Sequence, residues 1–187
     1  MKHSTHKIQR LSRIFKIVFL ICAFALPVID AGFWITNGYP FLKPWMRWDP
    51  FYHFDNLPIK PLPEMDVLIK FFGFLISLLP ASLNICAFIL LAKLFHCYEQ
   101  LEIFSRSTVL ILRKLGICIL LNQLLFPFYV AIFSLALTIT NPPGFRNISV
   151  AFGPEQVNLL IIGSLIILVS WIMDEGRKLQ EEQASTI

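Results

Sequence analysis

Side chains that could take part in chemistry are grouped at three places in this chain. The first is DPFYHFD, residues 49–55, where Asp49, His53 and Asp55 are residue types that bind metals or polar ligands. No further strong ligand nearby completes a metal geometry, and no phosphate-binding loop or nucleophile–base pair occurs in the sequence. The sequence therefore predicts no metal site, no cofactor, no catalytic residue and no enzymatic activity.

The second place is a set of amides inside strongly apolar segments. Asn84 precedes Lys93 by nine residues, and Gln123 follows Lys114 by nine, with Asn122 beside it. At a helical rise of about 1.5 Å per residue, these amides lie at one depth, so Asn84 is expected to meet Asn122 or Gln123 across an antiparallel hairpin. Two interpretations stay open. The contact holds two helices together, or it lines a path or gate for a small ligand.

The third place is the charged stretch HCYEQLEIFSRSTVLILRKLG, residues 96–116, together with the C-terminal MDEGRKLQEEQ. Ser105 is suited to cap a helix that begins after it, and Glu102 precedes it where a helix N-terminus favours an acid. Either segment alone reads as a solvated face, but both together predict a docking surface. Its residues are Tyr98, Glu102, Phe104, Ser105, Arg106, Arg113 and Lys114, with Glu175, Arg177, Glu181 and Glu182 from the tail.

The elements that position these residues are membrane helices. Hydrophobic residues make up 56% of the chain and charged residues 15%, and the mean hydropathy is +0.68. Apolar runs long enough to cross about 30 Å of hydrocarbon must be helical, because lipid offers no partner to the backbone. The prediction is a single all-α membrane domain over 1–187. Its four helices span about 14–34, 67–94, 107–138 and 156–180, with a cytosolic loop at 95–106 and outer loops at 35–66 and 139–155.

Lysine and arginine positions predict the orientation. Five basic residues precede the first apolar run, and Lys93, Arg106, Arg113 and Lys114 flank the second loop. The positive-inside rule then places both termini and the second loop in the cytosol, with an uncleaved first helix favoured over a signal peptide. The basic residues that give the net charge of +4 lie where this topology requires them, so the charge does not indicate nucleic-acid binding. Asp30 is expected to reach the outer interface, which argues against proton coupling.

The first outer loop is rich in proline and aromatic residues. It holds six prolines, and the tryptophans Trp34, Trp45 and Trp48 suit the membrane interface. One interpretation is a stiff cap that lies on the bundle. The other is a lid over an outward-facing pocket, with Trp45, Trp48, His53 and Asp55 as its contacts.

The second loop, the third loop and the tail resemble a bacterial membrane family called "domain of unknown function 2975". The matching residues are Tyr98, Glu102, Ile103, Phe104, Ser105, Arg113 and Gly116, then Asn141, Pro142, Pro143, Gly144 and Arg146, and finally Glu175, Gly176 and Glu182. The resemblance covers about residues 67–187 and departs at Leu101, where the family often has glycine, so no sharp turn is predicted there. It implies a four-helix protein of the bacterial inner membrane and supplies no activity. Some relatives occur beside small helix-turn-helix regulators, which implies a tethered partner.

The leading hypothesis is a non-enzymatic membrane protein whose cytosolic face recruits or regulates a protein partner, with a small helix-turn-helix regulator as the candidate partner. The alternative is a component that binds or transports a small molecule through the aromatic outer loop and the Asn84, Asn122 and Gln123 level. Besides the bilayer and this partner no other is predicted, and the sequence leaves the oligomeric state open.

Overall fold

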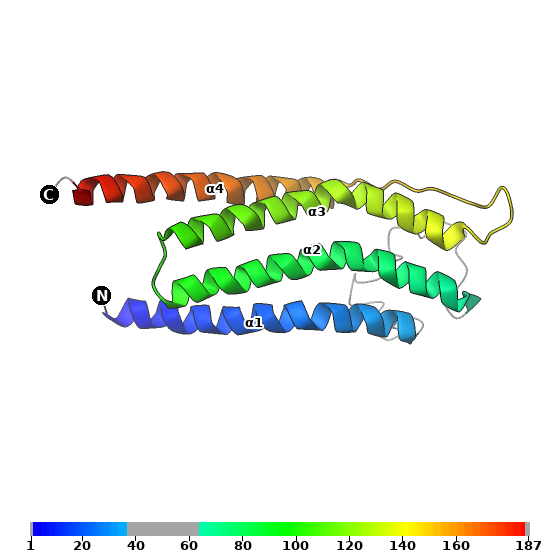
Figure 1. Ribbon diagram of the computed structural model, residues 1–187, viewed down its shortest axis with the longest axis horizontal. Helices are drawn as coiled ribbons and strands as arrows, with labels where there is room; N and C mark the ends of the chain where they lie inside the picture. The colour runs from blue at the N-terminus through cyan, green and yellow to red at the C-terminus, as the bar shows by residue number, and fades with distance from the viewer. Residues whose placement is uncertain (1, 37–63, 186–187) are drawn as a thin grey trace. The chain divides into compact units, whose positions relative to one another are not determined.

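The computed structural model describes residues 2–36 and 64–185, and these residues form an all-α protein (Figure 1). Its helices are α1 (Lys2–Ile35), α2 (Val67–Glu99), α3 (Arg106–Thr138) and α4 (Pro154–Ser185). Each helix is long and apolar enough to cross a membrane. The predicted fold class is therefore confirmed.

All four helices extend beyond the spans expected from the apolar runs. α1 begins at Lys2 instead of near residue 14, and α2 continues to Glu99 instead of ending near residue 94. The reason is that an apolar run marks only the part of a helix that lies in hydrocarbon. Charged residues such as those of 174–182 continue the same helix into water, where i, i+3 and i, i+4 ion pairs support it.

The chain separates into two compact units, the first assembled from three stretches of sequence and the second from two. Unit 1 comprises Met1–Phe24, Leu83–Gln123 and Pro154–Ile187, and unit 2 comprises Ala25–Ser82 and Leu124–Gly153. Three helices pass from one unit to the other, each close to a proline in its interior, namely Pro27, Pro80 and Pro127. Proline lacks an N–H group and therefore removes one bond of the helical ladder at each of these places.

In unit 1, α3 and α4 approach closely at two glycines. A Cβ atom placed on Gly116 would lie 2.6 Å from Cγ1 of Ile167 and 2.9 Å from the Gly163 carbonyl oxygen. A Cβ atom on Gly163 would lie 3.0 Å from Cδ2 of Leu120. Small residues at both positions let the two backbones meet, as is typical of membrane helix pairs. α1 and α2 pack instead through stacked phenylalanine rings, Phe15 on Phe95 and Phe19 on Phe88.

The core of unit 2 is aromatic. It consists of Phe33, Trp34, Met65, Ile69, Tyr129, Val130, Phe133 and Leu137. Trp34, which was predicted to suit the membrane interface, has a buried indole that packs edge-on against Phe133. Gly73 on α2 leaves the space that this indole fills, and any Cβ atom there would overlap the ring. The large ring and the missing side chain are therefore complementary.

The segment between α3 and α4 is not a simple surface turn. After Gly144, residues 145–153 have no helix or strand, and their backbone bonds to hydroxyl groups of α3. The Asn147 N–H donates to Oγ1 of Thr138 over 3.2 Å, and the Ser149 N–H donates to Oγ of Ser134 over 2.9 Å. Both hydroxyl-bearing residues are fully buried. Non-helical backbone can lie beside membrane helices only if its polar groups find such partners.

The α2–α3 loop contains a sharp turn at the residue where none was predicted. Leu101 has a φ of 64°, in the left-handed region that glycine adopts most easily. The Leu101 N–H donates to the Tyr98 carbonyl and the Glu102 N–H donates to the Cys97 carbonyl, so α2 is closed by bonds that require this turn. The chain therefore keeps the turn that glycine would make, with leucine in a strained conformation.

Leu101→Gly is expected to raise the free energy of unfolding, because a left-handed conformation costs a leucine roughly 1–2 kcal/mol. Part of that gain is lost to the greater freedom of glycine in the unfolded chain, so the net effect is about 0.5–1 kcal/mol. Thermal unfolding in detergent measures it. The control is Leu110→Gly, an exposed leucine within α3, where the same change should destabilise. A lower melting temperature for Leu101→Gly would contradict the strain.

Candidate functional site

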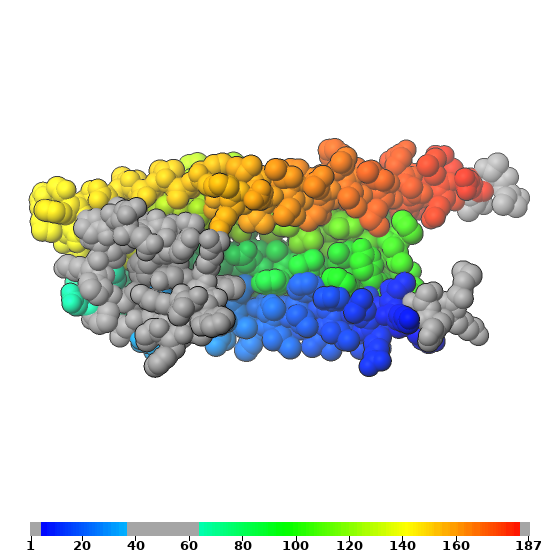
Figure 2. Space-filling model, turned by 180° about the vertical axis from the view of Figure 1, so that it is seen from behind, coloured from blue at the N-terminus to red at the C-terminus, as the bar shows by residue number. Residues whose placement is uncertain are grey.

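The residues predicted to form a docking surface gather at one end of unit 1. There the first residues of α1, the α2–α3 loop and the last residues of α4 lie together (Figure 1). From the other side, the blue start of α1 and the red end of α4 reach this same end, with green surface from α2 and α3 between them (Figure 2). Most of the chain's 16 Lys and Arg residues belong to unit 1.

The α2–α3 loop is held by a compact set of polar contacts around Thr108. Ser105 caps α3 as predicted, since its Oγ accepts the Thr108 N–H over 3.2 Å. The fully buried Thr108 hydroxyl donates to the Glu102 carbonyl over 2.7 Å and so ties the middle of the loop to α3. The side chains of Leu101 and Phe104 nevertheless remain 42% and 53% exposed. The loop therefore presents apolar groups from an ordered backbone.

Glu99, at the end of α2, joins α1 to this region, a pairing that the sequence did not indicate. Its carboxylate accepts from Nε of Arg13 over 2.7 Å and from Nζ of Lys16 over 2.6 Å. Gln9 adds a bond from its side-chain amide to the Glu99 carbonyl. The bonding partners lie more than 80 residues apart in the chain, so only the fold could reveal them.

The tail residues pair within α4 and with α3. Arg113 lies 3.6 Å from Asp174, and Arg177 bonds to Asp174 and to Glu181. The ion pair between α3 and α4 thus lies at Asp174, about two turns before Glu181. Arg106, Lys114, Glu102, Glu175 and Glu182 are exposed, and Tyr98 is half-buried against Phe95.

The amide pair lies in unit 1, between α2 and α3. Asn122 donates through Nδ2 to Oδ1 of Asn84 over 3.0 Å, whereas Gln123 is buried away from that contact. One turn nearer the loop, the Cys118 thiol donates to the Leu83 carbonyl. The structure thus brings together two of the three predicted amides. Asn84 is exposed on the bundle surface, which suits a bond between helices better than the lining of an enclosed path.

Asn84→Leu is expected to lower the free energy of unfolding in detergent by about 0.6–2 kcal/mol, because Asn122 then loses its partner across the hairpin. The matched control is Ser82→Ala, since the Ser82 hydroxyl is exposed and bonds to the Leu79 carbonyl of its own helix. Unchanged stability in Asn84→Leu would show that this contact does not hold the helices together.

Asp30 is a polar residue whose place the sequence did not reveal. It was predicted to reach the outer interface; in the structure only 9% of the residue is exposed, and it bonds to Ser77 of α2 over 2.7 Å. Ser77 follows Lys70 by seven residues, which places this contact about 10 Å farther along α2. A buried carboxyl group within a helix that can cross a membrane is rare and usually functional.

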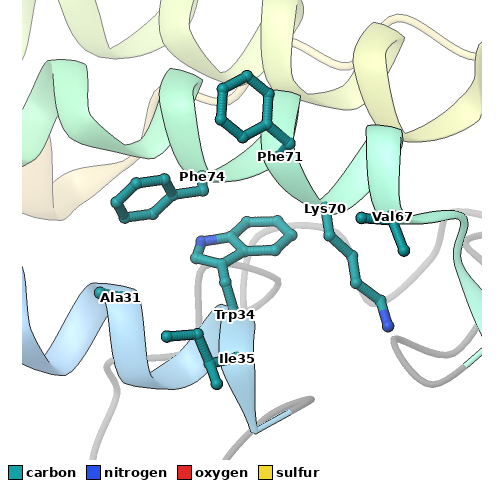
Figure 3. Close-up of a pocket in the computed structure, with 7 residues that line it drawn as sticks. All are labelled: Ala31, Trp34, Ile35, Val67, Lys70, Phe71 and Phe74. Atoms are coloured by element: carbon teal, nitrogen blue, oxygen red, sulfur yellow. The ribbon is translucent and has the colours of Figure 1, made fainter.

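Unit 2 also has an open apolar pocket of about 270 Å³ between α1 and α2. The indole of Trp34 and the rings of Phe71 and Phe74 line it, and Lys70 lies at its side (Figure 3). Its composition suits an apolar chain better than a polar solute. The predicted contacts of the outer loop, Trp45, Trp48, His53 and Asp55, lie outside the described residues, as does Asp49.

Within residues 2–36 and 64–185, no group of three or more His, Cys, Asp or Glu side chains is placed to hold a metal ion. Neither the curated proteins nor the solved structures include a match to this chain. The model of one protein family, described as "Protein of unknown function (DUF2975)", matches residues 43–187. The match begins within the aromatic loop, farther upstream than the resemblance at residues 67–187 indicated. The chain therefore belongs to the DUF2975 family.

Proposed function

We propose that this protein is a non-enzymatic anchor in the bacterial inner membrane that docks a cytosolic protein partner on its α2–α3 loop and C-terminal tail. Both termini face the cytosol in this proposal. The observation that supports it most strongly is the ordered loop that keeps Leu101 and Phe104 exposed. An ordered loop favours binding, because it loses little conformational freedom when a partner covers it and the entropic cost of binding is therefore small.

The position of the loop supports a protein partner rather than burial in lipid. Arg113 and Lys114 have the charge expected of residues at the headgroups, and Phe104 precedes the start of α3 at Arg106. Arg113 follows Arg106 by seven residues in α3, which places the loop about 10 Å outward from that level. α4 likewise continues from Asp174 to Ser185, about 16 Å farther along its axis.

The partner that we propose to test first is a small helix-turn-helix regulator, which the family resemblance implies. With the purified regulator, Phe104→Ser is expected to weaken binding about tenfold or more, because an exposed aromatic anchor typically contributes about 2 kcal/mol. The matched control is Phe145→Ser, since Phe145 is 60% exposed but belongs to unit 2. Equal affinity for the wild type and Phe104→Ser would exclude this role for the loop.

A photo-crosslinking amino acid at position 104, introduced in living cells, tests the same proposal in the native membrane. Adducts with the regulator, reduced by Leu101→Asp, support docking. Adducts with lipid alone at position 104, matching those at the exposed position 162 of α4, would mean that the loop binds the bilayer surface.

Binding of a small apolar molecule is a second candidate function, favoured by the pocket beside Trp34. Trp34→Ala should enlarge the pocket and change the fluorescence response to an added lipid-like ligand, whereas Phe104→Ser should not affect it.

A further inference from the structure

The Ser77 hydroxyl group has two acceptor oxygens within hydrogen-bond distance, one of Asp30 and one of Phe74, but only one proton to donate. Oγ of Ser77 lies 2.7 Å from Oδ2 of Asp30 and 2.8 Å from the Phe74 carbonyl oxygen. A serine hydroxyl has one proton to donate and two lone pairs that accept. If Asp30 is a carboxylate, only one of these two short contacts is a hydrogen bond. If Asp30 is a carboxylic acid, its O–H donates to Ser77 and both contacts are bonds.

Other serines of this protein indicate where the Ser77 proton goes. Ser82, Ser134 and Ser170 each donate to the carbonyl three residues earlier, as Ser77 can to Phe74. Ser134 is the closest parallel, because it donates to the Ala131 carbonyl and also accepts the Ser149 N–H over 2.9 Å. By the same geometry, Ser77 donates to Phe74 and is left to accept from Asp30.

The surroundings of Asp30 favour the neutral form. Within the described residues no Lys, Arg or His forms an ion pair with it, and the polar groups that interact with it from other helices include Ser77 of α2 and Tyr129 of α3. Tyr129 is the titratable group that interacts with it, and a neutral phenol supplies no compensating positive charge. A carboxylate buried among apolar side chains without a counter-ion usually takes up a proton instead.

We infer that Asp30 is a proton-binding site within the membrane part of unit 2. At neutral pH its carboxyl group carries a proton, and the resulting O–H donates a hydrogen bond to Oγ of Ser77. When the proton leaves for a base in solution, the electron pair of the O–H bond stays on the carboxylate. The Ser77 hydroxyl then turns from the Phe74 carbonyl to Asp30. The site goes beyond partner docking, because all of its residues belong to unit 2 and the docking residues belong to unit 1.

Dicyclohexylcarbodiimide, which enters membranes, tests the proposal on the full-length protein. A protonated carboxyl group gives its proton to the carbodiimide nitrogen, its oxygen adds to the carbodiimide carbon, and the adduct rearranges to a stable N-acylurea. At pH 7.5 Asp30 is expected to be labelled at least about tenfold more than Asp66, whose carboxyl group is exposed to water. Mass spectrometry of the peptides measures both sites. Selective labelling that disappears in Asp30→Asn supports the site.

Infrared spectroscopy decides the matter if the reagent does not reach Asp30. The wild type at pH 7.5 should show the C=O stretching band of a protonated carboxylic acid, and this band should shift in D₂O and be missing from Asp30→Asn. Asp30→Asn should also keep the wild-type melting temperature, because a neutral amide replaces a neutral acid. If that variant does not fold, Asp30→Glu, in which the band should move without disappearing, takes its place. A spectrum without the band at pH 7.5 would overturn the proposal.

Discussion

Gly116→Ala is expected to lower the free energy of unfolding by about 1–3 kcal/mol, because the new methyl group would overlap Ile167 and the backbone carbonyl of Gly163. The side chain of Ile167 can turn aside, but the carbonyl can move only if the two helices separate. Separation would also weaken the neighbouring contact between Arg113 and Asp174. Chemical unfolding in detergent measures the loss.

The chain supplies two comparisons for the same substitution. Gly163→Ala should cost less than Gly116→Ala, because the nearest atoms belong to the flexible end of Leu120. Gly176→Ala should stabilise by about 0.5–1 kcal/mol, because nothing lies within 4 Å of its Cβ position and alanine favours the helix. Equal effects at all three glycines would contradict a close crossing at Gly116.

Thr138→Val is expected to release the segment 145–153 from α3 and to cost about 1–3 kcal/mol. Valine keeps the shape of threonine but removes the hydroxyl group that accepts the Asn147 N–H. The same hydroxyl lies 3.1 Å from the Asn147 carbonyl, so the valine leaves the partly buried Asn147 N–H and an acceptor with one bond fewer. Faster hydrogen exchange at the Asn147 amide would accompany the loss of stability.

Ser134→Ala should act on the same segment, because Ser134 accepts the Ser149 N–H. Ser164→Ala is its control, since Ser164 is exposed and donates only within α4, to Leu160. If exchange at Asn147 and Ser149 is as slow in Thr138→Val and Ser134→Ala as in the wild type, these hydroxyl groups do not hold the segment.

The contacts that could be predicted from the sequence are those set by distance along a helix. Asn84 and Asn122 meet because both lie at similar distances from flanking lysines, and a fixed rise converts residue number into depth. The cap at Ser105 was predictable because the residue type and the start of the apolar run coincide. The number of helices and their α-helical type could be predicted because backbone N–H and C=O groups in lipid must bond to one another within the segment.

Contacts that depend on the packing of distant segments could not be predicted in this way. Asp30 lies only five residues before the end of α1, which suggested the interface, but its depth is set by Ser77 of α2. Glu99 likewise bonds to residues of α1, and no pattern near it indicates that partnership. Leu101 shows a further limit, because the backbone bonds at the end of α2 impose a left-handed turn that its side chain disfavours.

The proposed function requires above all that the α2–α3 loop face the cytosol. Single cysteines at positions 104 and 145 test this requirement, in a folded variant whose four native cysteines are replaced by alanine. A maleimide that cannot cross membranes should label position 145 in intact spheroplasts and position 104 only in inverted vesicles. Both native side chains are more than half exposed, so accessibility within the protein does not bias the comparison. Labelling of position 104 from outside intact spheroplasts would contradict the account.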